Sequence, residues 1–94
     1  MTSLPRDTAV RVDYRVRRRK YADTAVLIRN TDFVEIDDVT DTIWLTVEQG
    51  ATVAGVITAL VDRHDLPLGE AMAAAVATLE HLRGIGFVVY DPPT

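Results

Sequence analysis

The sequence predicts an α+β domain in which a three-stranded antiparallel sheet is followed by three helices. Apolar and charged residues alternate near the N-terminus, which indicates strands, whereas apolar residues recur every three to four positions from Val39 to Leu82, which indicates helices. Strands grouped before helices argue against a parallel sheet. Three helices beside a small sheet are also the layout of winged helix-turn-helix proteins, so we expect a winged helix-turn-helix-like arrangement.

Three strands are expected before the helices. Apolar and charged residues alternate from Val10 to Arg17, which is the period of a half-buried strand, and the strand is expected to continue to Tyr21. Ala22-Asp23 offers a turn into a second, more apolar strand at Thr24–Arg29. Asn30-Thr31-Asp32 offers the next turn, into a third strand at Phe33–Asp37. Together these segments predict an antiparallel meander.

The first helix is expected to begin at Asp37-Asp38, where a carboxylate can accept hydrogen bonds from free backbone amides. Its apolar residues fall on one stripe, and Trp44 beside that stripe should be the largest part of the core. Gly50 suits the left-handed position that ends a helix. The stripe comprises Val39, Ile43 and Val47.

Two further helices are predicted. Thr52 is placed to cap the second, which ends at the proline-containing break Asp65–Leu68. The third runs from Leu68 to Arg83, is rich in alanine and stops at Gly84, and Phe87–Tyr90 follows as a short strand. The apolar stripe of the third helix comprises Met72, Val76, Leu79 and Leu82.

Ninety-four residues allow one domain with a thin core. We expect a flexible N-terminal arm at residues 1–9, a single domain at residues 10–90 and a tail at residues 91–94. Hydrophobic residues make up 48% of the chain, which argues against intrinsic disorder. The chain has no cysteine, no apolar signal region and no apolar run of about 20 residues, so we expect a cytoplasmic protein that does not enter membranes.

Charge is unevenly distributed along the chain. The first twenty residues carry seven bases and two acids, and the other seventy-four carry three bases and twelve acids, so a segment of charge +5 precedes a body of charge −9. Basic segments of this kind occur in nucleic-acid-binding arms. The interpretation that we favour is a two-faced strand whose arginines are solvated.

Side chains that could support catalysis are sparse. His64 and His81 lie on different predicted helices in no metal-binding spacing, and His64 is expected at a polar helix end. A group of four carboxylates lacks the ligand loop and glycine of a calcium site. No phosphate-binding glycine loop is present. We therefore expect no catalysis, metal or cofactor in this chain. The carboxylate group comprises Glu35, Asp37, Asp38 and Asp41.

Nucleic-acid binding is the alternative function. In a helix-turn-helix the second helix of the pair presents Arg, Lys, Asn or Gln to base edges. Here that helix is Leu68–Arg83, whose early turns carry Glu70 and no base. Base readout is therefore disfavoured, and a nucleic-acid binder would have to use the basic N-terminal strand.

Peptide capture fits the same features better. A sheet edge presents unpaired N–H and C=O groups, so an extended peptide can add to it as another strand. The short third strand is expected at such an edge. The alanine-rich third helix can form the other wall of a cleft.

The chain resembles the PqqD family, small domains that are also called RiPP recognition elements. The resemblance covers roughly Arg15–Val89 and rests on the succession of apolar and turn positions. The second strand, Val26–Asn30, lacks the proline and glutamate often seen in proteins of the pyrroloquinoline quinone pathway, so the resemblance does not imply a role in that pathway. The segments that carry it are Phe33–Asp38, Asp41–Trp44, Gln49–Val53 and Leu79–Val88.

Members of this family bind the leader segment of a ribosomally made precursor peptide, which pairs with the third strand and packs against the third helix. Which face of that helix looks at the cleft stays open, because its main apolar stripe also serves the core. The resemblance implies strand contacts from Phe33, Val34, Glu35 and Ile36. It implies helix contacts from Met72, Val76, Leu79, Glu80 and Arg83.

We therefore expect a non-catalytic adaptor that presents the leader peptide to a maturation enzyme, such as a radical SAM enzyme or a lasso-peptide protease. A basic patch is a candidate for docking that enzyme or for contacting acidic leader residues. A homodimer formed through the exposed strand edge is a third hypothesis. The basic patch comprises Arg17, Arg18, Arg19 and Lys20.

Overall fold

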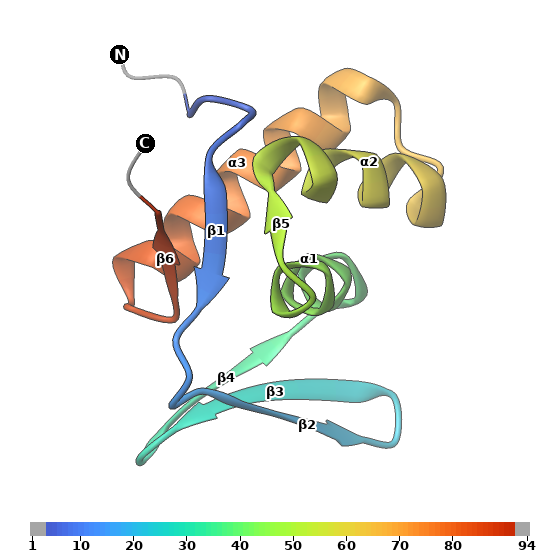
Figure 1. Ribbon diagram of the computed structural model, residues 1–94. Coiled ribbons are helices and arrows are strands. Elements are labelled where there is room, and N and C mark those ends of the chain that lie inside the picture. Colours follow the sequence, from blue (N-terminus) through green and yellow to red (C-terminus); the bar gives the residue numbers. More distant parts are fainter. Residues whose placement is uncertain (1–3, 92–94) are drawn as a thin grey trace.

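The computed structural model describes residues 4–91 and has an α+β fold with two small antiparallel sheets and three helices (Figure 1). The first sheet has the order β5–β1–β6, formed by Ala51–Thr52, Ala9–Val12 and Val88–Tyr90. The second has the order β2–β3–β4, formed by Arg17–Tyr21, Thr24–Arg29 and Asp32–Ile36. The helices are α1 (Asp38–Glu48), α2 (Val53–His64) and α3 (Leu68–Gly84).

The predicted meander is confirmed as β2–β3–β4, the lower sheet in Figure 1. Both connections are two residues long, at Ala22-Asp23 and Asn30-Thr31. Ala22 and Asn30 adopt left-handed backbone angles, with φ of 53° and 56°. Asparagine tolerates this region well, because its side chain can hydrogen-bond locally, whereas alanine is less common there.

The first predicted strand is wrong in one respect, because it forms two strands that belong to different sheets. The carbonyl of Asp13 accepts the amide of Val16 at 3.0 Å, and Asp13 Oδ1 accepts the amide of Arg15 at 2.9 Å. Because of this turn, β1 pairs with β5 and β6 in one sheet, whereas β2 pairs with β3 in the other. The alternation of polarity does not reveal the turn, because Val16 is buried again directly after it.

The helix caps form where the sequence predicts them. Asp37 Oδ1 accepts the amide of Thr40 at 2.8 Å, at the start of α1. Thr52 Oγ1 accepts the amide of Gly55 at 3.2 Å, at the start of α2. Gly50 has a φ of 86°, which favours glycine over other residues.

The core lies between the helices and the two sheets. Helix α1 packs against α2, and α2 packs against α3. Trp44 is fully buried, as predicted. The buried stripe of α3 differs from the predicted one, because Met72 and Val76 are only half-buried and two alanines replace them. That stripe comprises Ala71, Ala75, Leu79 and Leu82.

Part of the expected N-terminal arm is bonded to α2. The carbonyls of Arg6 and Thr8 accept the amides of Ala54 and Val53, at 2.9 and 3.0 Å. Leu4 packs against the core. Residues 1–3 of the expected arm and residues 92–94 of the expected tail lie outside the described residues. Within residues 4–91, none of the helices has the length and apolar character needed to cross a membrane.

Candidate functional site

Strand β4 is an edge of its sheet. Among the described residues its only strand neighbour is β3, so one side of its backbone has no strand partner. Val34 and Ile36 pair with the buried residues Leu27 and Ala25, and therefore point toward the core. Phe33 and Glu35 consequently point to the outer face, where 73% of the surface of Phe33 is exposed.

The pairing register determines which backbone groups of β4 face outward. Hydrogen-bonded and non-hydrogen-bonded pairs alternate along an antiparallel ladder. The two-residue connection between Arg29 and Asp32 makes them a hydrogen-bonded pair, so Leu27↔Val34 is also hydrogen-bonded. The N–H and C=O groups of Phe33 and Glu35 therefore point away from β3, toward the free edge.

A groove runs along this edge. It consists of two open hollows of about 300 and 460 Å³ that meet at Val34, and we call them together the β4–α3 groove. The first hollow lies between the strand and α3 and is lined by Val34, Glu35, Ile36, Asp37, Thr40, Ala77, Thr78, His81 and Leu82. The second lies beside the link from α3 to β6 and is lined by Thr31, Asp32, Phe33, Val34, Ile85 and Phe87.

All four strand residues implied by the family resemblance line this groove. Val34, Glu35 and Ile36 line the first hollow, and Phe33 and Val34 line the second. Strand position was readable from the sequence because β4 is the last strand before the helices. The outward side chains follow from its alternation, whereas the outward backbone groups follow from its pairing register with β3.

The helix residues implied by the resemblance lie elsewhere. Met72, Val76, Glu80 and Arg83 do not line the groove, and Leu79 is fully buried in the core. An α-helix turns about 100° per residue, so the groove side of α3 and the Met72 side flank its buried stripe on opposite sides. The groove side comprises Ala77, Thr78 and His81.

Contacts on the other flank of α3 agree with this placement. Arg6 Nη2 lies 3.1 Å from the sulfur of Met72, and the guanidinium of Arg83 stacks 5.0 Å from the ring centroid of Tyr90 in β6. The helix residues implied by the resemblance do not include Ala77, Thr78 or His81, which lie beside the apolar stripe. In the sequence, this side of α3 could have been identified by its small and polar residues, which lie next to the buried stripe.

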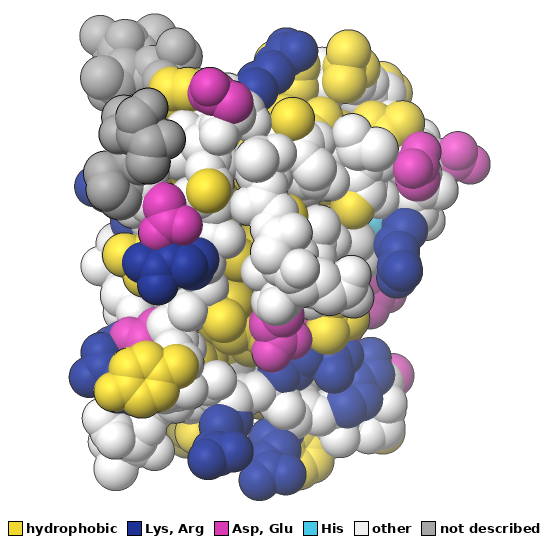
Figure 2. All heavy atoms as spheres, viewed as in Figure 1, with side chains coloured by type: hydrophobic (Ala, Val, Ile, Leu, Met, Phe, Trp, Pro, Cys, Tyr) yellow, Lys and Arg dark blue, Asp and Glu magenta, His cyan; other side chains and the backbone are white. Residues whose placement is uncertain are grey.

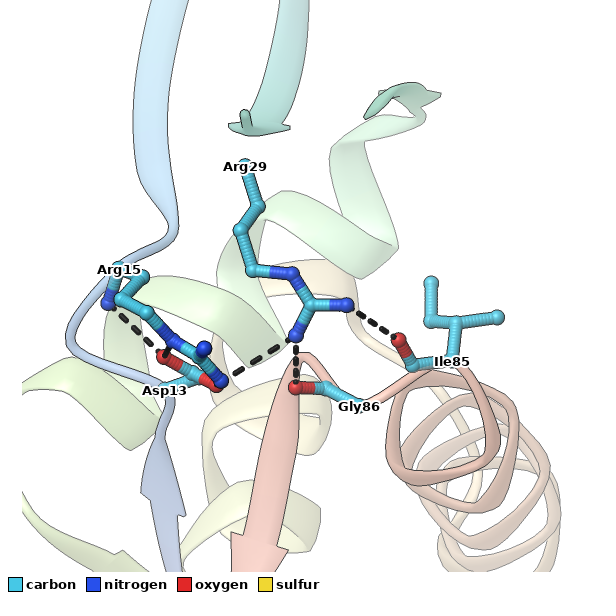
Figure 3. Close-up of polar contacts among 5 residues, drawn as sticks. All are labelled: Asp13, Arg15, Arg29, Ile85 and Gly86. Carbon is cyan, nitrogen blue, oxygen red and sulfur yellow. Dashed lines mark hydrogen bonds and ion pairs between the residues drawn. The ribbon is translucent and has the colours of Figure 1, made fainter. Parts of the chain in front are cut away.

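Arg29 joins the two sheets at one end of the groove (Figure 3). Its Nη1 donates to the carbonyl of Gly86 at 2.8 Å, and its Nη2 donates to the carbonyl of Ile85 at 3.2 Å. Nη1 also lies 3.4 Å from Asp13 Oδ2, and the guanidinium stacks 5.1 Å from the ring centroid of Phe87. The end of β3 is thereby attached to the turn after β1 and to the link between α3 and β6.

The carboxylate of Asp13 is strongly stabilised in its charged form. Hydrogen bonds from the side chain and the amide of Arg15 hold the pKa of Asp13 well below its usual range. The nearby guanidinium of Arg29 acts in the same direction. Asp13 therefore remains an anionic partner for Arg29 at any pH near neutrality.

The basic patch lies on β2, at the opposite edge of the sheet from the groove. Figure 2 shows lysine and arginine side chains gathered over the lower sheet. Arg18 points inward, and its Nη2 lies 2.7 Å from Asp41 Oδ2, which lowers the pKa of Asp41. Arg17, Arg19 and Lys20 have no ion-pair partner within the described part of the chain, and all three are exposed.

His64 has a structural contact. Its Nε2 lies 2.8 Å from Thr42 Oγ1, which links the end of α2 to α1. His81 lies on the groove side of α3 and lines the same hollow as Glu35 and Asp37. Within residues 4–91, no group of three or more His, Asp or Glu side chains is placed to hold a metal ion.

Comparison with protein families and with curated proteins identifies no relative of this chain. No protein-family model matches the chain, and no curated protein matches it. The groove, the strand edge and the distribution of charge are therefore the features that bear on function.

Proposed function

We propose that this chain is a non-catalytic adaptor that binds an extended peptide by adding it as a strand to β4. The observation that carries the proposal is the groove along the free edge of β4, toward which the backbone groups of Phe33 and Glu35 point. In strand addition, main-chain hydrogen bonds provide affinity and pockets for alternate side chains provide specificity.

The dimensions and lining of the groove support this proposal. β4 has five residues, so a paired peptide segment of the same length would extend about 17 Å. Side chains of that segment that point inward would meet apolar surface from Ile36, Leu82 and Phe87. In this proposal β2–β3–β4 and the three helices correspond to a winged helix-turn-helix-like layout.

The resemblance to the PqqD family suggests the nature of the peptide. In this reading the ligand is the leader segment of a ribosomally synthesised precursor. The partner is a maturation enzyme, such as a radical SAM enzyme or a lasso-peptide protease, and chemistry is performed by that enzyme. The adaptor itself needs no cofactor.

The test is a selection from random twelve-residue peptides displayed on phage, followed by fluorescence anisotropy with the enriched peptides. We expect saturable binding at micromolar concentration or tighter, which corresponds to about 8 kcal/mol. Binding should depend only mildly on salt. Failure to enrich any peptide, or enrichment of peptides that bind away from β4, would contradict the proposal.

A nucleic-acid binder is the second candidate, favoured by the exposed Arg17, Arg19 and Lys20 on β2. Contacts to phosphates release counterions, so the affinity for a DNA duplex would fall steeply as salt is raised. A random-sequence duplex titrated beside the peptides separates the two functions. Tight, salt-sensitive DNA binding without peptide binding would favour this alternative.

A further inference from the structure

We infer that the peptide taken up by β4 is basic, with a lysine or arginine facing Glu35 and an apolar side chain facing Phe33. This inference rests on the proposed function, because it describes the ligand of the same groove. Charge complementarity at the groove and the register of the sheet carry it.

The described lining of the groove carries carboxylates and neither lysine nor arginine. The carboxylates are Asp32, Glu35 and Asp37, and Asp37 is already occupied as the cap of α1. Arg29 pairs with Asp32 in the register of the sheet, but its guanidinium bonds to Asp13 and to the two carbonyls beyond α3. Glu35 is exposed and has no ion-pair partner among the described residues.

The basic patch is not part of the groove lining and lies two strands away from Glu35. Arg19 pairs with Val26, which in turn pairs with Glu35, so two strand spacings of about 4.8 Å each separate Arg19 from Glu35. Both side chains lie on the outer face of the sheet. An acidic peptide in the groove would meet like charge first, whereas a basic peptide would meet opposite charge.

Strand addition extends the rows of side chains across the sheet. The peptide residues beside Phe33 and Glu35 would lie two positions apart on the outer face, and the residue between them would point inward against α3. Opposite charges and aromatic–apolar pairs stabilise neighbouring strands. The expected motif is therefore an apolar, an apolar and a basic residue at three consecutive positions, and their order gives the direction of the peptide.

The experiment compares peptide selections on the wild-type protein and on Glu35→Arg. The wild type should enrich lysine or arginine two positions from an apolar residue. Glu35→Arg should enrich aspartate or glutamate at that position, and exchanging the peptide charge should change affinity by about three- to tenfold in opposite directions for the two proteins. Asp62→Arg makes the same change of charge at an exposed position of α2, outside the groove, and should leave the preference for a basic peptide intact.

The outcomes separate this inference from the proposed function. Peptides that require the groove but show no charge preference, or the same preference with Glu35→Arg, would overturn the inference and leave the proposed function standing. Both would be overturned if no peptide is enriched, or if the enriched peptides bind Ala77→Trp with the same affinity as the wild type. Circular dichroism of Glu35→Arg establishes that the variant is folded.

Discussion

Arg29 Nη1 lies 2.8 Å from the carbonyl oxygen of Gly86, although 57 residues separate them in the sequence. Gly86 has a φ of 80°, and a Cβ at this position would approach Arg29 Nη1 to 3.1 Å. The left-handed backbone therefore favours glycine here, and an added Cβ would also press against the guanidinium of Arg29. This contact connects the strand that supports β4 to the link that forms the far wall of the groove.

Replacing Arg29 by methionine should lower the free energy of unfolding by about 2–4 kcal/mol. The change leaves the carbonyls of Ile85 and Gly86 without a charged donor in a largely covered site, and it leaves Arg15 as the only guanidinium that contacts Asp13 among the described residues. Urea unfolding followed by the fluorescence of Trp44 measures the difference. Arg19→Met is the control, because Arg19 is exposed and should change stability by less than about 0.5 kcal/mol. Equal effects of the two substitutions would show that the junction is not structural.

Stability should fall on acidification. Hydrogen bonds lower the pKa values of Asp13, Asp37 and Asp41 in the folded protein, relative to about 3.9 in the unfolded chain. A lowered folded pKa means that the stabilising contribution is present above about pH 4 and is lost as the pH falls through the folded value. The urea midpoint should therefore be nearly constant from pH 7 to pH 5 and decline below pH 4.

Asp41→Asn tests one part of this dependence. The substitution removes the ionic partner of Arg18 and should cost about 1–3 kcal/mol at pH 7. The cost should shrink as the pH falls below 4, because the carboxylate takes up a proton first in the unfolded chain and then, at the lowered pKa of Asp41, in the folded protein. Stability curves of the two proteins that stay parallel down to pH 2 would contradict the role assigned to the Arg18–Asp41 pair.

Proline at position 33 should selectively impair peptide binding. The amide of Phe33 points to the free edge, so Phe33→Pro removes a donor to the peptide without removing a bond to β3. Phe33→Ala loses the same side chain and keeps the amide. We expect anisotropy titrations to show about tenfold weaker binding for proline than for alanine.

Equal affinities of these two variants would exclude main-chain pairing at Phe33. Val34→Pro is a poor substitute for this test, because the amide of Val34 bonds to β3. Its loss would damage the ladder that holds β4 in place. Thermal unfolding of both variants at position 33 shows whether the sheet is intact.

Filling the groove from the helix side should block the peptide. Ala77 is exposed and lines the groove, so Ala77→Trp inserts a large side chain into the first hollow with little effect on the core. Ala73→Trp makes the same change on the same helix outside the groove lining. Peptide affinity should fall at least about tenfold for Ala77→Trp and stay within about twofold for Ala73→Trp. The reverse result would contradict binding of the peptide in the first hollow.

Much of the secondary structure was readable from local sequence. Asp37 and Thr52 cap helices through their own side chains, and Gly50 supplies a left-handed backbone, so these boundaries depend on neighbouring residues alone. The β2–β3–β4 meander follows from two short turns and the apolar run between them. The strand Val88–Tyr90 was also predicted, but its pairing with β1, and the strand Ala51–Thr52 on the other side of β1, were not predicted from local sequence.

The sequence by itself determined the α+β class and the caps, and it predicted the edge position of β4. Only the tertiary structure decided which flank of α3 faces that strand and where the basic strand lies relative to the groove. Both depend on the turn at Asp13 and on the contacts of Arg29 with residues more than fifty positions away. Periodicity reports which side of an element is apolar, whereas the partner that covers each side is chosen by packing between distant segments.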